Sequence, residues 1–311
     1  MSILKTPSAQ FANLPGFPYQ PNYLEIPDQE YGSLAMHYVD EGPKQAPVVL
    51  MLHGEPSWSF AWRDVIDAVT AAGFRAIAPD HIGFGRSDKL AQRNHYSYAR
   101  FIDWMDYFVT ALELENITLA CQDWGGPIGL STLARHPERF NAVVAANTLL
   151  PNNEEPPLGV ADWPGDIVAN WINTVAELDD LPVADIVGGV CSTPLSNEVK
   201  AAYDAPFPTP EYKAAVLAFP ALIPIDHKLS GSAENRLVWE LLEQWTKPFV
   251  TAFSDGDPST AAWAKVFQSR IPGASNDLHR TIRNAGHFVQ EEQGAALAEV
   301  IIAATQKGNA P

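Results

Sequence analysis

Short apolar segments alternate with longer segments of helical periodicity along most of the chain, and this alternation restricts the fold more than any other feature. The predicted strands are Val48–Leu52, Arg75–Pro79, Ile117–Cys121, Ala142–Ala146, Phe249–Ser254 and Leu278–Arg283. Apolar positions recur at helical spacing over 60–69, 98–114, 127–135 and 295–305. Strands that are apolar throughout and separated by helices form a parallel sheet covered on both faces. We therefore predict an α/β fold with a mostly parallel central sheet flanked by helices, and Tyr31–Val39 is a candidate for an early antiparallel strand.

Residues 151–224 have a different composition, because they are rich in proline and contain no segment with a strand pattern. Short helical patterns at 166–178 and 196–203 lie between the prolines. We therefore expect an inserted helical cap over residues 150–228, between two parts of one core, 1–149 and 229–311. Open parallel sheets bind ligands at the carboxyl edge of their strands, and we expect the cap to cover that edge.

Charge and cysteine content exclude several classes of function. The formal net charge of −17 repels phosphate backbones and anionic lipid, so we expect neither a nucleic-acid partner nor a membrane partner. Cys121 and Cys191 are too few for a disulfide framework and lack metal-ligand spacing, so no metal site is predicted. Residues 1–10 lack the apolar run of a signal peptide, and no apolar run is long enough to span a membrane. We therefore expect a cytoplasmic protein.

The segment from Cys121 to Gly126 has the form of a nucleophile elbow, a sharp turn between a strand and a helix with small residues around an exposed side chain. Asp123 takes the place usually held by serine. A carboxylate is a poor acylating group for esters, but it can displace a leaving group from an sp³ carbon. The alternative role for Asp123 is that of an ordinary helix N-cap.

A histidine and an acid to orient it follow the last two predicted strands. His287 comes directly after one of these strands, and as a neutral imidazole it would act as a general base toward the elbow. Asp255 and Asp257 both follow the strand Phe249–Ser254. We favour Asp257, because the fourth residue of such a turn projects over the sheet, although Asp-Gly and Asp-Pro pairs also form turns by themselves. Asn147, which follows the strand after the elbow, is neutral and cannot serve as this acid.

The loop after the first strong strand, His53-Gly54-Glu55-Pro56, lies where this architecture forms half of an oxyanion hole. The backbone N–H groups of Glu55 and Trp124 are the predicted donors. His53 itself is expected to be structural. His81, in the turn after the next strand, receives no role.

Three signatures in this order resemble the haloalkane dehalogenases of the α/β-hydrolase superfamily. They are His53-Gly54-Glu55-Pro56, Gln122-Asp123-Trp124-Gly125-Gly126 and Gly286-His287-Phe288-Val289-Gln290-Glu291. The resemblance extends from His53 to Glu292, includes the cap segment 203–208, and is greatest to the subfamily with an Asp-His-Asp triad and two halide-binding tryptophans. It implies an α/β-hydrolase fold with a helical cap.

The resemblance also implies a reaction. Asp123 would displace halide from a small apolar halogenated substrate, and His287, oriented by Asp257, would activate the water that hydrolyses the resulting ester. The products would be an alcohol, a halide ion and a proton, with no cofactor. The indole N–H of Trp124 would bind the halide, together with a tryptophan of the cap, for which Trp171 fits the family spacing better than Trp163.

An epoxide hydrolase is the alternative reading, because it shares the aspartate nucleophile and the His-Asp pair. It requires two cap tyrosines, and Tyr203 and Tyr212 are the candidates. A binding protein without turnover is the alternative outside catalysis, although such proteins usually lack a member of the triad. The sequence does not determine the oligomeric state, the halogen preference or the substrate length.

Overall fold

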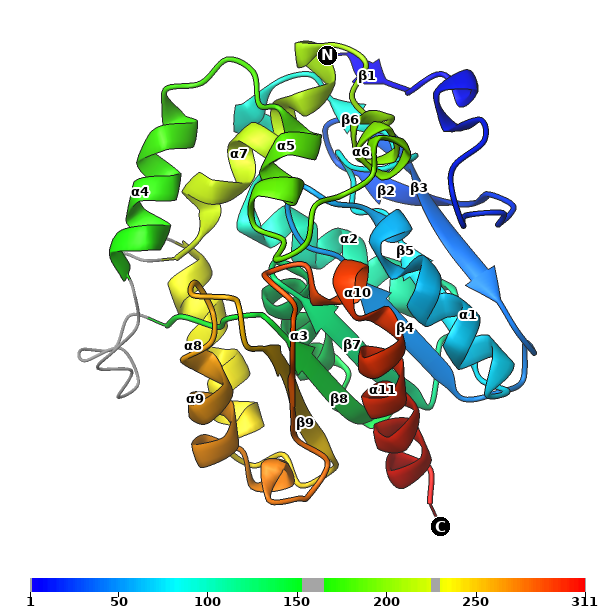
Figure 1. Ribbon diagram of the computed structural model, residues 1–311, viewed down its shortest axis with the longest axis vertical. Helices are drawn as coiled ribbons and strands as arrows, with labels where there is room; N and C mark the ends of the chain where they lie inside the picture. Colours follow the sequence, from blue (N-terminus) through cyan, green and yellow to red (C-terminus); the bar gives the residue numbers. More distant parts are fainter. Residues whose placement is uncertain (1, 153–164, 225–229, 311) are drawn as a thin grey trace.

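A computed structural model describes residues 2–152, 165–224 and 230–310 (Figure 1). Its centre is an eight-stranded sheet in the order β10-β9-β8-β7-β4-β5-β3-β2. The strands are β2 (Asn22–Asp28), β3 (Gly32–Glu41), β4 (Val48–Leu52), β5 (Arg75–Pro79), β7 (Ile117–Gln122), β8 (Phe140–Ala146), β9 (Phe249–Ser254) and β10 (Arg280–Ile282). A separate two-stranded sheet pairs β1 (Ile3–Leu4) with β6 (Lys89–Leu90). The α/β fold predicted from the alternating pattern is confirmed.

Six neighbouring strands of this sheet are parallel to one another: β10, β9, β8, β7, β4 and β5. Strands β3 and β2 extend the sheet beyond β5 in antiparallel pairs. All residues of β4, β7 and β9 are buried, because these strands have helices on both faces. The expected antiparallel strand over 31–39 corresponds to β3. Strand β2 was not predicted, because it is a half-exposed edge strand that contains Pro27.

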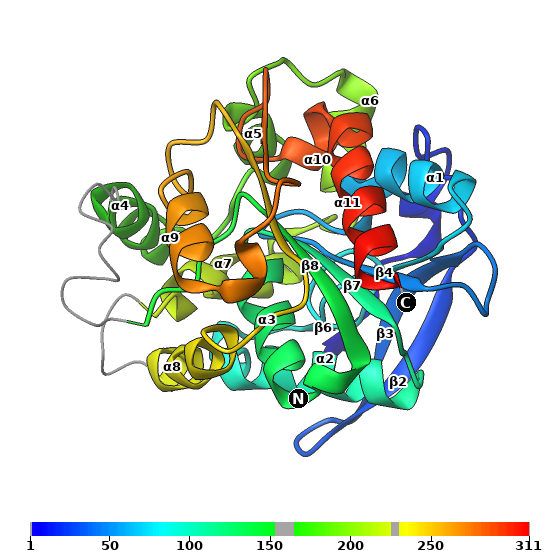
Figure 2. The same cartoon turned by 90° about the horizontal axis from the view of Figure 1, so that it is seen from below.

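Helices cover both faces of the sheet, as Figure 2 shows from below. Helices α1 and α11 pack against one another on one face, and α2, α3 and α8 pack together on the other. Helix α9 lies beside α8, where the rings of Phe267 and Trp239 stack. The bounds are α1 (Arg63–Ala71), α2 (Tyr98–Ala111), α3 (Gly125–Arg135), α8 (Ser230–Leu242), α9 (Trp263–Arg270), α10 (Val289–Glu292) and α11 (Gly294–Gly308).

Between β8 and α8 the described chain contains helices and no strand, and Figure 1 shows these helices gathered at one end of the sheet. They are α4 (Gly165–Ala176), α5 (Val183–Gly189), α6 (Asn197–Asp204) and α7 (Ala214–Leu222). Helices α4 and α6 were predicted to within two residues. Helix α7 was not, because almost all of its residues are buried and apolar, which leaves no amphipathic period. In the described ranges, no helix is both long and apolar enough to cross a membrane.

Candidate active site

Asp123 occupies the turn between β7 and α3 and has a backbone φ of 50°. This left-handed conformation is strained for a residue with a side chain. The two glycines that follow allow the turn to sit close to its neighbours. A Cβ atom on Gly125 would collide with the carbonyl of Leu52, and one on Gly126 would collide with the side chain of Thr148. The turn therefore has the geometry of a nucleophile elbow, with Asp123 projecting from the carboxyl edge of the sheet.

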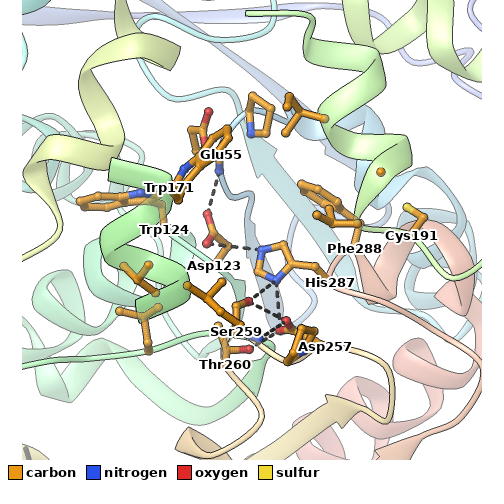
Figure 3. A pocket seen from close by; sticks show the side chains of 18 of the residues that line it. Glu55, Asp123, Trp124, Trp171, Cys191, Asp257, Ser259, Thr260, His287 and Phe288 are labelled. Carbon is orange, nitrogen blue, oxygen red and sulfur yellow. Dashed lines mark hydrogen bonds and ion pairs between the residues drawn. The ribbon is translucent and has the colours of Figure 1, made fainter. Parts of the chain in front are cut away.

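His287 lies between two carboxylates, on the loop that connects β10 to α10 (Figure 3). Its Nε2 is 3.4 Å from Oδ2 of Asp123, and its Nδ1 is 3.0 Å from Oδ2 of Asp257. The backbone N–H of His287 donates to the carbonyl of Val190, in the segment after α5, with a length of 2.8 Å. A single imidazole thus connects a residue that follows β7 with one that follows β9.

The acid beside His287 is Asp257, and Asp255 lies elsewhere. Asp255 is exposed, and its Oδ1 accepts a hydrogen bond from the backbone N–H of Asn284. Asp257 is buried and accepts further hydrogen bonds from the N–H and hydroxyl of Ser259 and from the hydroxyl of Thr260. Burial raises the pKa of Asp257, but His287 and these donors outweigh burial and hold the pKa well below its usual range.

The carboxylates of Asp257 and Asp123 in turn change the pKa of the His287 imidazole. Burial lowers the pKa of His287, whereas the charges of Asp257 and Asp123 raise it, and the result is a pKa of about 10. While both carboxylates are charged, the ring is therefore held as an imidazolium between them. Any change that neutralises Asp123 removes one of these charges and makes the ring less basic.

Glu55 contributes its backbone to the elbow and its side chain to the cavity. Its backbone N–H donates a 2.9 Å hydrogen bond to Oδ1 of Asp123. Its carboxyl group is buried, and among the described residues its Oε1 has no hydrogen-bond partner. Burial and the charge of Asp123 raise the pKa of Glu55 well above its usual value, which favours the neutral form of its carboxyl group.

A cavity of about 530 Å³ opens above Asp123, between the core and the helices α4 and α5. The core lines it with Glu55, Asp123, Trp124, Asp257, His287 and Phe288, and the helical segment with Ile167, Val168, Trp171, Ile186, Val190 and Cys191. Figure 3 shows Trp124 and Trp171 on the opposite side of Asp123 from Asp257. Within the described part of the chain, neither indole N–H has an acceptor in the protein. Trp163, the alternative to Trp171, lies outside the described residues.

Two residues that support the site were not predicted. The side-chain amide of Asn147 donates to the hydroxyl of Ser254 and to the carbonyls of Gly286 and His287, so that it joins the ends of β8 and β9 to the histidine loop. The side-chain amide of Gln122 contacts the His287 ring. Gln122 ends β7 next to Asp123, and Asn147 directly follows β8. These positions were the only signals in the sequence.

His53 and His81 form a buried pair below the site. The backbone N–H of His81 donates to Nε2 of His53, and the ring centroids are 4.3 Å apart. Burial lowers the pKa of both imidazoles, so that both are neutral near pH 7. This arrangement fits the structural role expected for His53.

The sheet order, the elbow and the inserted helices define an α/β-hydrolase. The family model described as the alpha/beta hydrolase fold matches residues 47–179.

Whole-chain comparisons identify the family within this class. A haloalkane dehalogenase of Psychrobacter cryohalolentis is 45% identical over 97% of both chains, and one of Mycolicibacterium paratuberculosis is 40% identical over 97% of this chain and 98% of its own. The tetrameric structure of the haloalkane dehalogenase of Paraglaciecola agarilytica NO2 has a TM-score of 0.88 and 34% identity, covering 97% of this chain and 98% of that chain. The structure of the haloalkane dehalogenase of Agrobacterium tumefaciens C58 has a TM-score of 0.75 and 25% identity, covering 97% of this chain and 100% of that chain. The chain belongs to the haloalkane dehalogenases, which are hydrolases acting on carbon–halide bonds.

Proposed function

We propose that this enzyme hydrolyses the terminal carbon–halogen bond of small apolar haloalkanes through an ester on Asp123. The observation that carries the proposal is the position of the His287 ring, between Asp123 and Asp257 at the floor of a largely apolar cavity. In the proposed reaction, Asp123 is the nucleophile, His287 is the general base and Asp257 is the acid that orients the base. No cofactor and no metal take part in this route.

In the first step, an oxygen of Asp123 attacks the carbon that bears the halogen. The new C–O bond forms as the carbon–halogen bond breaks, and the bonding pair leaves with the halide. An anion in an apolar cavity needs hydrogen-bond donors, because its desolvation is costly. The indole N–H groups of Trp124 and Trp171 supply them, since an indole nitrogen only donates. Oδ1, which the Glu55 N–H already holds, becomes the carbonyl oxygen of the ester.

In the second step, His287, which is less basic once the charge of Asp123 is lost, first releases its Nε2 proton to solvent. Water then attacks the Cγ atom of the Asp123 ester and gives a proton to Nε2. The charge that develops on Oδ1 is stabilised by the backbone N–H groups of Glu55 and Trp124. Asp257 stabilises the imidazolium through Nδ1. Collapse breaks the bond between Cγ and the alkyl oxygen. The alcohol leaves with one proton of the water, and the second proton stays on His287 and restores the imidazolium.

The proposal assigns a separate task to each part of the chain. Residues 1–149 and 229–311 form the core that carries the triad, and residues 150–228 form a cap that supplies Trp171 and closes the cavity. The cavity admits small uncharged molecules, and the net charge of −17 disfavours nucleic acid and anionic membranes as partners. The two free cysteines fit an enzyme that acts in the reducing cytoplasm.

Epoxide hydrolysis is disfavoured by the positions of the two cap tyrosines. The hydroxyl of Tyr203 is buried and donates to Oε2 of Glu291, so that it is not available to protonate an epoxide oxygen. Among the described residues that line the cavity, neither Tyr203 nor Tyr212 is present.

The test is the release of halide and protons from terminal bromo- and chloroalkanes by wild type, Asp123→Asn and His287→Phe. We expect turnover by wild type only, and His287→Phe should accumulate protein heavier by one alkyl group in intact mass spectra. His136→Phe is the matched control, because His136 pairs with Asp106 at 2.8 Å but lies outside the cavity. It should turn over like wild type. Halide release by Asp123→Asn, or no adduct in His287→Phe, would contradict the proposal.

A further inference from the structure

Gln122 is the last residue of β7 and is completely buried, and the route above leaves its side chain without a role. Its Nε2 lies 3.1 Å from Nε2 of His287 and 3.2 Å from the backbone oxygen of the same residue. At the other end of the amide, Oε1 accepts a 3.1 Å hydrogen bond from Nε2 of Gln290. The Gln122 amide therefore contacts the ring nitrogen that faces Asp123.

The backbone carbonyl of His287 fixes the orientation of this amide. A carbonyl oxygen only accepts hydrogen bonds, so the end of the Gln122 amide that contacts it must be the NH2 group. Exchanging the two ends would place Oε1 of Gln122 against that carbonyl oxygen, and two acceptors would then face one another. The NH2 group of Gln122 thus points toward His287.

The NH2 group carries two hydrogens, one for the backbone carbonyl and one directed at Nε2 of the ring. The second hydrogen meets a lone pair only when Nε2 carries no proton. Nδ1 of the ring is hydrogen-bonded to the Asp257 carboxylate, so a neutral ring keeps its proton at Nδ1. We propose that Gln122 is a positioning residue that holds His287 in the neutral tautomer protonated at Nδ1, with the Nε2 lone pair ready to accept a proton from water.

The charges around the His287 ring determine in which step of the reaction the Gln122 amide can stabilise the neutral ring. Three carboxyl groups face His287: Asp257 from the loop after β9, Asp123 from the elbow and Glu55 from the loop after β4. Burial and the charge of Asp123 raise the pKa of Glu55 and so favour its neutral form, whereas Asp123 as a carboxylate favours a proton on Nε2 and so opposes Gln122. Once Asp123 is esterified its charge is gone, and the hydrogen of Gln122 acts on Nε2 without this opposition. The contribution of Gln122 thus belongs to ester hydrolysis and depends on the proposed function of Asp123 and His287.

The test separates the two steps in single-turnover experiments on Gln122→Met and Gln122→Glu. Gln122→Met removes the donor at similar volume, and we expect ester hydrolysis to slow about tenfold while alkylation stays within about twofold of wild type. In Gln122→Glu a carboxylate accepts from a protonated Nε2 and stabilises the imidazolium. The pH profile of its ester hydrolysis should therefore shift upward by about one unit. Retained alkylation shows in the same protein that the variant is folded.

Gln290→Met is the matched control. It removes the buried hydrogen bond to Oε1 of Gln122, but the His287 carbonyl still orients the Gln122 amide. We therefore expect ester hydrolysis and its pH profile to stay within about twofold of wild type. The proposal is overturned if Gln290→Met slows ester hydrolysis as much as Gln122→Met, or if both Gln122 variants keep the wild-type rate and profile. If neither wild type nor His287→Phe forms an ester, the proposed function itself fails, which is a different outcome.

Discussion

The phenolic hydroxyl of Tyr203, on α6, donates a 2.6 Å hydrogen bond to Oε2 of Glu291 in α10. Glu291 also accepts two 2.6 Å hydrogen bonds from the guanidinium group of Arg63. Both oxygens of the buried carboxylate therefore have donors, and this arrangement lets a charge remain inside the protein. Because Glu291 lies four residues after His287, the bond joins the proposed cap to the helix that follows the general base.

Substitutions of Tyr203 and Glu291, which remove hydrogen bonds or charge from the Tyr203–Glu291–Arg63 cluster, should destabilise the protein to different extents. Tyr203→Phe loses one hydrogen bond to a charged group, so the free energy of unfolding should fall by about 1.5–3 kcal/mol. Glu291→Gln leaves the Arg63 charge buried without a counter-charge and should cost about 3–5 kcal/mol. Urea unfolding measures both, with Tyr107→Phe on the exposed face of α2 as the control. Equal unfolding midpoints for Tyr203→Phe, Glu291→Gln and the control would contradict this account.

Replacement of the acid should affect ester hydrolysis most strongly. Asp257→Asn cannot stabilise the imidazolium that forms as water loses its proton, so ester hydrolysis should slow by roughly 10²–10⁴-fold. The alkyl-enzyme should then accumulate, as intact mass spectra would show after mixing with substrate. Asp255→Asn is the control, because Asp255 is exposed and bonds to the backbone of Asn284. If Asp255→Asn accumulated the ester and Asp257→Asn did not, the assignment would be reversed.

The sequence predicted those parts of the fold and site that depend on local patterns. The fully buried strand β4 was predicted because every one of its residues is apolar. The elbow was predicted because the positions of Gly125 and Gly126 accept only small residues. Helix α7 could not be predicted from periodicity, since it is apolar on all sides. The contacts of Gln122 and Asn147 with the histidine loop join residues more than a hundred positions apart, and no local pattern encodes them.

The stability of the free enzyme should depend on pH through His287. Its pKa is raised from an ordinary value near 6.5 to about 10 in the folded protein, so its contribution is fully present below pH 6.5 and is lost as pH rises through 10. Lys89 acts with the opposite sign, because burial lowers its pKa to about 7. The measurement is therefore a difference, the unfolding free energy of wild type minus that of His287→Gln, at intervals from pH 6 to about 10. This difference should decline steadily across the range, and a constant difference would refute the raised pKa.

Halide affinity should depend on the two indole N–H groups that face the cavity. Trp124→Phe and Trp171→Phe keep an aromatic ring but lose the donor. A hydrogen bond to an ion contributes about 1.5–3 kcal/mol, so each change should raise the dissociation constant for bromide by about 10–150-fold. Titration followed by intrinsic fluorescence measures this constant. Trp104→Phe is the control, since its Nε1 donates to Asp28 outside the cavity, and it should bind bromide like wild type. If Trp171→Phe also bound like wild type, the second donor would have to come from another part of the cap.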